Sequence, residues 1–83
     1  MSKFQSKIIS QYEKTGHIVL NVIKLSDSGY PDLICLKDGV ATFIECKEAK
    51  DTLKPLQRHR IDEINKAGFT AFCLQDGLGV IYP

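Results

Sequence analysis

The dipeptide Asp38-Gly39 narrows the possible folds of this chain more than any other feature. It separates two apolar runs rich in β-branched residues, Asp32–Lys37 and Val40–Lys47. Asp-Gly between such runs is among the strongest short-range signals of a β-hairpin with a two-residue turn. If these two residues form the turn, the residues on either side of it pair with each other, and the register of every later pair follows.

That register places two acidic residues opposite each other at the open end of the hairpin, Asp32 and Glu45. Cβ atoms of directly opposed residues lie about 4.5–5.5 Å apart, so two like charges there destabilise the hairpin unless something compensates. A hard divalent cation is the natural compensator because it prefers carboxylate oxygens. Lys47 points to the same face, since side chains alternate along a strand. A bulged turn would shift the register by one residue and separate the two acids.

The remaining patterns predict a mixed α/β domain. Apolar residues recur at three- and four-residue steps in the helical segments, and β-branched residues dominate the strands. Pro is favoured in the first turn of a helix and Gly just after its end. The expected order is αβββαβ, with a short final strand: helix 3–15, strand 17–25, loop 26–31, the two hairpin strands, polar connection 48–54, helix 55–67, strand 69–74 and strand 77–82.

Length and composition predict one small domain, residues 1–83. A chain of 83 residues with 43% hydrophobic side chains can form a real core. A domain of this size buries only about 60–65% of its unfolded surface, so a partner chain would help to stabilise it. No apolar run approaches the ~20 residues of a membrane span. The first residues lack the apolar block of a signal peptide, and we therefore expect a cytoplasmic protein.

The three cysteines, Cys35, Cys46 and Cys73, do not form a recognisable framework. Their odd number and wide spacing are not typical of disulfides, and no Cys-x-x-Cys pair suggests zinc. We expect buried, reduced thiols that act as small hydrophobic side chains. A zinc site assembled in space with His17 and His59 is a less favoured alternative.

Basic residues concentrate in one segment although the net charge is only +1. Lys50, Lys54, Arg58 and Arg60 all follow the hairpin closely. Such a charge run is either a solvated surface or a set of contacts to the phosphates of a nucleic acid. We take these four residues as candidate nucleic-acid ligands.

The motifs carry a family resemblance. The run Gly29–Asp32 and the run Phe43–Lys47, followed by Gln57 at the start of a helix, resemble the VRR-NUC branch of the PD-(D/E)XK nuclease superfamily. The resemblance covers nearly the whole chain, including the element order. It implies a restriction-endonuclease-like core with a mixed sheet flanked by helices. That branch includes small stand-alone nucleases of phages and bacteria and is similar to Holliday-junction resolvases.

Carried over residue by residue, the resemblance makes Asp32 and Glu45 the ligands of Mg²⁺ or Mn²⁺. The backbone carbonyl of Cys46 would be a further metal ligand, and Lys47 the catalytic lysine. Gln57 matches a family glutamine near the active site, and it shares a helical stripe with apolar residues. The alternative for Gln57 is an amide that bonds to nearby backbone.

One departure concerns the first helix, where the family often has a glutamate as another metal ligand. Here the comparable positions hold Ser2 and Gln5, and the first acidic residue is Glu13, near the end of the predicted helix. The number of bound ions is therefore left open.

The resemblance implies a metal-dependent endonuclease that hydrolyses phosphodiester bonds in DNA, with a preference for a junction, flap or nick left open. The alternative is a non-catalytic nucleic-acid-binding module with the same fold. We also expect a homodimer, because cutting both strands of a duplex needs two sites and the related resolvases are dimers as a rule. Strand 17–25 is the candidate interface because both of its faces are apolar, unless helices of the same chain cover them.

Overall fold

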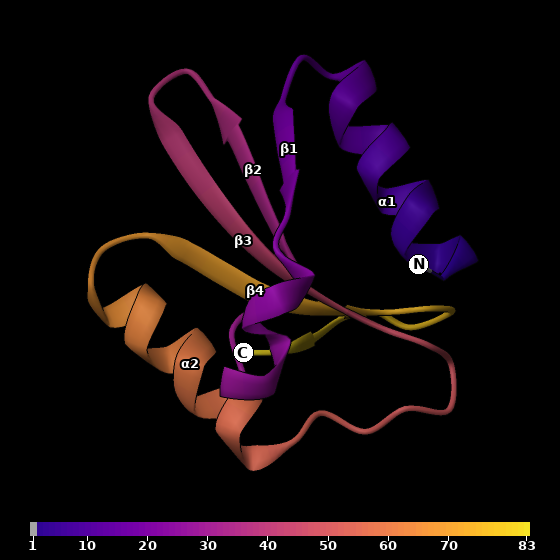
Figure 1. The fold of residues 1–83 in the computed structure, drawn as a ribbon, viewed down its shortest axis with the longest axis vertical. Helices are drawn as coiled ribbons and strands as arrows, with labels where there is room; N and C mark the ends of the chain where they lie inside the picture. Colours follow the sequence, from indigo (N-terminus) through magenta and orange to yellow (C-terminus); the bar gives the residue numbers. More distant parts are fainter. Residues whose placement is uncertain (1) are drawn as a thin grey trace.

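The computed structural model describes residues 2–83, with the side chains of residues 24–26 left out of the description. A single five-stranded sheet has the order β1-β2-β3-β4-β5, in which β3 and β4 run parallel and the other neighbours antiparallel (Figure 1). The predicted α/β class and element order are confirmed. The elements are α1 (Lys3–Lys14), β1 (Ile18–Asn21), the 3-10 helix η1 (Ile23–Ser28), β2 (Leu33–Lys37), β3 (Val40–Lys47), α2 (Pro55–Lys66), β4 (Thr70–Gln75) and β5 (Gly79–Tyr82).

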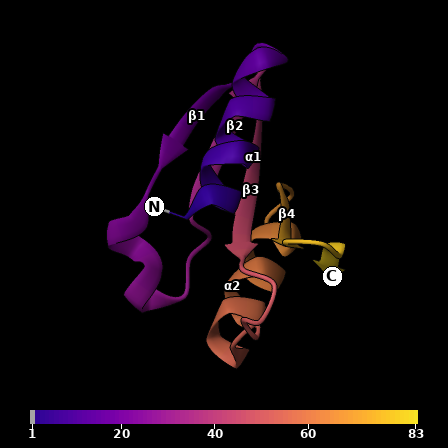
Figure 2. The same cartoon turned by 90° about the vertical axis from the view of Figure 1, so that its right-hand side faces the viewer.

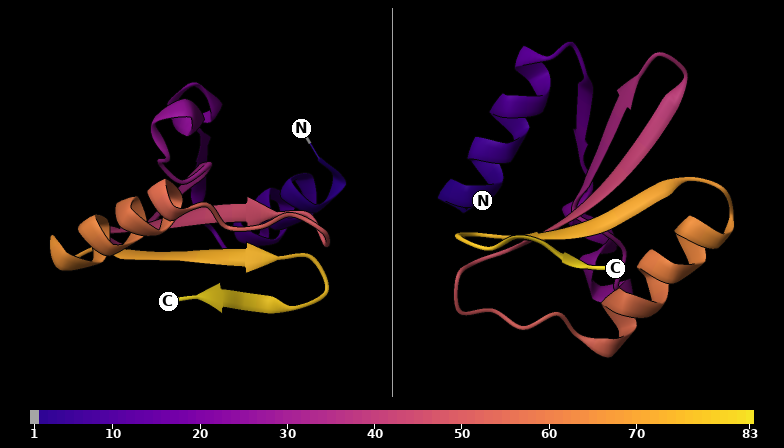
Figure 3. Two further views of the ribbon diagram at one scale, coloured as in Figure 1. Left: turned by 90° about the horizontal axis from the view of Figure 1, so that it is seen from below. Right: turned by 180° about the vertical axis from the view of Figure 1, so that it is seen from behind.

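The two long helices cover opposite faces of the sheet and build two small cores. In Figure 2, α1 lies in front of β2 and β3, while α2 lies below, against β4. The views of Figure 3 show β5 beside β4 at one edge of the sheet. The α1 core contains Ile8, Leu33, Cys35 and Ile44, and the α2 core contains Leu53, Ile61, Ala71 and Cys73. In the described part of the chain no helix is long and apolar enough to cross a membrane.

The hairpin has the predicted turn and register. Asp38 and Gly39 both have positive φ angles, 52° and 76°, as a type I′ turn requires. Lys37 pairs with Val40, and the ladder continues without a bulge up to Leu33 opposite Ile44. The alternation of side chains therefore holds along the whole hairpin, and no shift separates the residues at its open end.

Both helices lie within one residue of their predicted limits. The Ser2 hydroxyl accepts a hydrogen bond from the backbone N–H of Gln5 at 3.0 Å and so caps α1. Pro55 is the first residue of α2, where its missing N–H costs no hydrogen bond.

The predicted strand 17–25 is wrong in its second half. β1 ends at Asn21, and the chain continues into η1. The last bond of the ladder joins the N–H of Val22 to the carbonyl of Asp32 at 2.8 Å. Beyond this bond the backbone leaves the extended conformation and adopts the i→i+3 hydrogen bonding of a 3-10 helix, so the ladder with β2 cannot continue.

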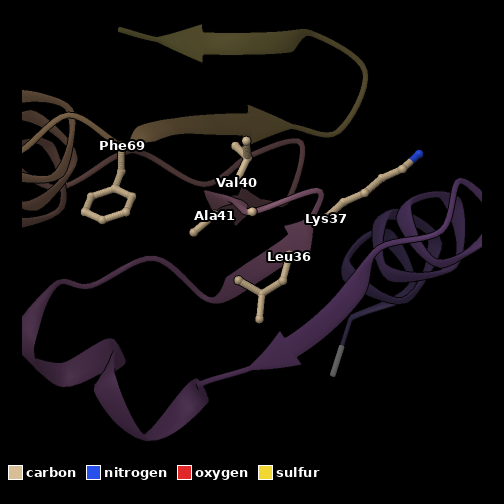
Figure 4. A pocket seen from close by; sticks show the side chains of 6 residues that line it. Leu36, Lys37, Val40, Ala41 and Phe69 are labelled. Atoms are coloured by element: carbon tan, nitrogen blue, oxygen red, sulfur yellow. The ribbon is translucent and has the colours of Figure 1, made fainter.

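One part of the sheet face on the α2 side is uncovered. Ile18 and Leu20 pair with the β2 residues Leu36 and Ile34, and they are 64% and 42% exposed. Next to them lies a shallow hollow of about 320 Å³. Figure 4 shows apolar side chains around this hollow, while the amine of Lys37 points away from them. The hollow is lined by Leu36, Lys37, Gly39, Val40, Ala41 and Phe69.

Candidate active site

The two acidic residues meet at the open end of the hairpin. Asp32 directly precedes β2, and its Oδ2 accepts a hydrogen bond from the backbone N–H of Cys46 at 3.1 Å. Glu45 is only 3% exposed, and its carboxyl group is hydrogen-bonded to the side chain of Asp32. The hairpin register therefore brings these two predicted site residues into direct contact.

The environment of Glu45 favours its protonated form. Burial raises its pKa to about 8, the charge of Asp32 and their shared hydrogen bond act in the same direction, and Lys47 opposes them. Near neutral pH the pair therefore keeps a proton between its two carboxyl groups. A divalent cation would replace that proton and remove the repulsion between the two acids.

Lys47 lies beside the acids on the same face of β3. Its side chain is nearly buried, and its Nζ is 3.9 Å from Oε2 of Glu45. The carbonyl of Lys47 accepts a hydrogen bond from the backbone N–H of Asp76 at 2.9 Å, which ties the end of β3 to the end of β4. The ammonium is thus held next to the carboxylates by a fixed backbone.

The donor set suits a hard cation. Asp32 and Glu45 offer carboxylate oxygens, which Mg²⁺ and Mn²⁺ prefer. The Cys46 thiol lies on the opposite face of β3, packed against the α1 core, and burial followed by the charges of Asp32 and Glu45 raises its pKa to about 12. Over residues 2–83 no cluster of three or more His, Cys, Asp or Glu side chains could hold a metal ion. A cation held by Asp32 and Glu45 would need further ligands, and the backbone carbonyl of Cys46 is the one that the family resemblance implies.

Gln57 lies in the first turn of α2, and its side chain bonds to its own helix terminus. Its Oε1 accepts a hydrogen bond from the backbone N–H of Lys54 at 2.9 Å. The amide therefore satisfies one of the free donors at the helix start. This is the contact that we named as the alternative to an active-site role.

Glu13 and Gln5, the two candidates for the place of the family's first-helix glutamate, lie at opposite ends of α1. Glu13 is exposed, near the end of α1 where the carbonyl of Thr15 accepts a hydrogen bond from Lys37, beside the hairpin turn. This end is far along the hairpin from Glu45. Gln5 lies in the first turn and is 8% exposed. Within the described residues its Nε2 is a buried nitrogen without a hydrogen-bond partner.

Gln75 is a residue of this region that the sequence analysis missed. It pairs with Lys47 across β3 and β4 and is buried. Its Nε2 lies 3.0, 3.3 and 2.7 Å from the carbonyl oxygens of Glu48, Ala49 and Asp51. One side-chain amide therefore holds the segment that directly follows Lys47. A glutamine at the end of an apolar strand is the only sequence signal of this role.

The four basic candidates differ in their surroundings. Lys50 and Lys54 are exposed on the connection between β3 and α2. Arg58 is also exposed, with its guanidinium 5.4 Å from the ring centre of Tyr82. Arg60 is less accessible, because its guanidinium bonds to a backbone carbonyl and to a glutamate. Three of the four are thus exposed, and Arg60 is the one whose guanidinium forms hydrogen bonds within the protein.

Comparisons with known proteins show which family and which solved structures the chain is similar to. The family model described as the VRR-NUC domain matches residues 2–75. A solved structure titled "VRR_NUC domain" is similar with a TM-score of 0.73 and 27% identity, over 86% of this chain and 78% of that chain. Another, titled "VRR_NUC domain protein", has a TM-score of 0.48 and 23% identity, over 80% of this chain and 50% of that chain, so this chain spans half its length. The search of curated proteins finds no match.

Proposed function

Because the chain belongs to the VRR-NUC family, a family of nuclease-type domains, we propose that it is a divalent-metal-dependent endonuclease that hydrolyses phosphodiester bonds in DNA. One observation carries the proposal. The carboxyl groups of Asp32 and Glu45 are hydrogen-bonded to each other at a nearly buried site, and the Lys47 ammonium is 3.9 Å from Glu45. Two acids in contact destabilise a metal-free protein, and a metal-binding role explains why they are there.

The residues of the site have different roles in the proposed reaction. Asp32 and Glu45 supply the oxygens that hold Mg²⁺ or Mn²⁺, and the Cys46 carbonyl is the third ligand. The bound cation supplies positive charge that offsets the charge of the phosphate and makes water more acidic. Lys47 donates hydrogen bonds to the attacking water or to a phosphoryl oxygen, where negative charge develops. Its burial strengthens that interaction, because the surroundings screen charge less than bulk water does.

The DNA backbone would reach this site along the exposed basic segment. Lys50 and Lys54 precede α2, and Arg58 lies one turn into it. Each phosphate that such a residue neutralises releases counterions, so binding weakens as salt rises. We expect the Lys50→Gln, Lys54→Gln double variant to lower the slope of log affinity against log salt by roughly two units, about one per lost contact. An unchanged slope would assign these lysines to the solvated surface.

A cleavage assay tests the proposal directly. Labelled duplex, nicked, flap and four-way-junction DNA are incubated with Mg²⁺, with Mn²⁺ and with a chelator. We expect cleavage with either metal only, loss of cleavage in Glu45→Gln, and parental activity in Glu13→Gln, which removes an exposed carboxylate at the other end of the sheet. DNA binding without cleavage under all metal conditions would favour the non-catalytic module instead. The panel also identifies the preferred DNA structure.

We further propose that the active form is a homodimer assembled through the uncovered sheet face at β1. Ile18 and Leu20 are exposed there, and the second helix packs on β4 rather than over them. A second copy would bury this apolar edge and supply the site for the other DNA strand. Light scattering at micromolar concentration should give twice the chain mass, and Leu20→Lys should give a monomer. A parent that scatters as a monomer and still cuts both strands at one place would contradict this proposal.

A further inference from the structure

The segment that leads into Asp32 rests directly on α2. Gly29 is buried and has a φ angle of +80°. A Cβ atom built on it would lie 2.6 Å from Cγ of Leu56 and 3.1 Å from the backbone carbonyl carbon and oxygen of the same residue. Only glycine allows this approach, because it tolerates the positive φ and has no side chain to push the helix away. Loop and helix are therefore in backbone contact.

Arg60, one turn after Leu56 in α2, also binds the segment that leads into Asp32. Its Nε donates to the carbonyl of Ser28 at 2.9 Å, and its guanidinium carbon lies 4.4 Å from the ring centre of Tyr30. Its Nη1 donates to Oε1 of Glu63 at 3.0 Å. A planar guanidinium can stack and form several directed hydrogen bonds at once, and here it uses one face for the ring and two donors for the protein.

The chain has little conformational freedom between the Arg60 contacts and Asp32. Tyr30 is followed by Pro31, whose φ is restricted and which is fully buried. Asp32 comes next, and its carbonyl is held by the N–H of Val22. A shift of the Arg60 contacts therefore moves Asp32 relative to the carboxyl group that it faces on β3.

We propose that Arg60 is a positioning residue that keeps Asp32 in its metal-binding position, rather than a contact to DNA phosphate as its place in the basic segment suggested. This inference rests on the proposed metal-binding function of Asp32. A phosphate would have to compete with the carbonyl of Ser28 and the carboxylate of Glu63 for the N–H groups of the guanidinium. Arg58 is the matched comparison, because it is an exposed arginine on the same helix that also lies over a tyrosine ring.

The experiment measures Mn²⁺ binding without DNA, through the loss of the electron paramagnetic resonance signal of the free ion. Partners that orient metal ligands typically change metal affinity 10–100-fold when mutated. We expect Arg60→Gln to weaken Mn²⁺ binding about tenfold, and Arg58→Gln to leave it unchanged. For DNA binding we expect the opposite pattern. Arg58→Gln should lower the slope of log affinity against log salt by about one unit, and Arg60→Gln should leave that slope unchanged.

Two further variants separate positioning from general loss of structure. Circular dichroism is used first to find a temperature at which every variant is folded. Tyr30→Leu removes the stacked ring and leaves every charge in place, so it should weaken Mn²⁺ binding in the same direction. Arg60→Lys keeps a donor for the Ser28 carbonyl and should recover part of the affinity.

The outcomes distinguish the inference from the function on which it rests. A parent protein that binds no Mn²⁺ would overturn the proposed metal site itself. A parent that binds Mn²⁺ while Arg60→Gln binds it equally well, with a reduced salt slope for DNA, would overturn the positioning role and make Arg60 a phosphate contact.

Discussion

The acid pair makes a specific prediction about stability when no metal is bound. Glu45 has an ordinary pKa of 4.5 that rises to about 8 in the folded protein, mainly because it is buried. The folded state therefore holds a proton that the unfolded chain releases above pH 4.5. The stability from this group is fully present below pH 4.5 and is lost as the pH rises towards 8. Glu45→Gln cannot ionise, so we expect it to remove this loss while keeping a hydrogen-bond donor towards Asp32.

The size of the effect follows from the shift. One pKa unit corresponds to 1.36 kcal/mol, so the full displacement of Glu45 limits the effect to about 5 kcal/mol at pH 8. An effect of only about 1–2 kcal/mol would already be measurable, because for a domain of this size each kcal/mol moves the melting temperature by roughly 4–8 °C. We therefore expect metal-free Glu45→Gln to melt at least ~4 °C above the parent at pH 8, and close to the parent at pH 4.5.

Circular dichroism measures the melting temperatures of the parent and of Glu45→Gln in the presence of a chelator. The melts are repeated at half-unit steps from pH 4.5 to 8. Glu13→Gln is the control, because its carboxylate is exposed. Adding Mg²⁺ at pH 8 should raise the melting temperature of the parent and leave that of Glu45→Gln nearly unchanged. Parallel pH curves for parent and Glu45→Gln would refute the reasoning that burial and Asp32 keep this carboxyl group protonated.

Substitutions at three other residues test other parts of the site. Lys47→Ala should lose most of the cleavage rate and keep most of its DNA affinity, which single-turnover kinetics and a binding titration separate; equal rates would remove Lys47 from the mechanism. Gln75→Glu should destabilise the fold by about 3 kcal/mol because it turns a carboxylate towards three carbonyl oxygens, whereas Gln75→Lys, with three donors, should lose less; chemical denaturation ranks the two. Gln5→Glu should tighten Mn²⁺ binding if the buried Gln5 amide borders the site, and a titration that matches the parent would place Gln5 in the core alone.

The hairpin is the part of the molecule that the sequence determined by itself. Asp38-Gly39 favours one turn type, that turn fixes which residues pair, and strict alternation then puts Asp32 and Glu45 together. Every step depends on neighbours along the chain or on one tight turn, so local chemistry is sufficient. The helix limits were predictable for the same reason, since caps and prolines act within one turn. The family motifs were also visible, because they lie within these short segments.

Tertiary structure decided what supports the site. Arg60 bonds to a carbonyl 32 positions away, and Gln75 bonds to carbonyls 24, 26 and 27 positions away. No periodicity or spacing records such contacts, because they exist only once α2 and β4 have packed against the loops around the acids. The same holds for the early end of β1, where the chain leaves the ladder with β2 and continues into η1. The sequence therefore determined which groups meet at the site, and long-range packing decided what holds them there.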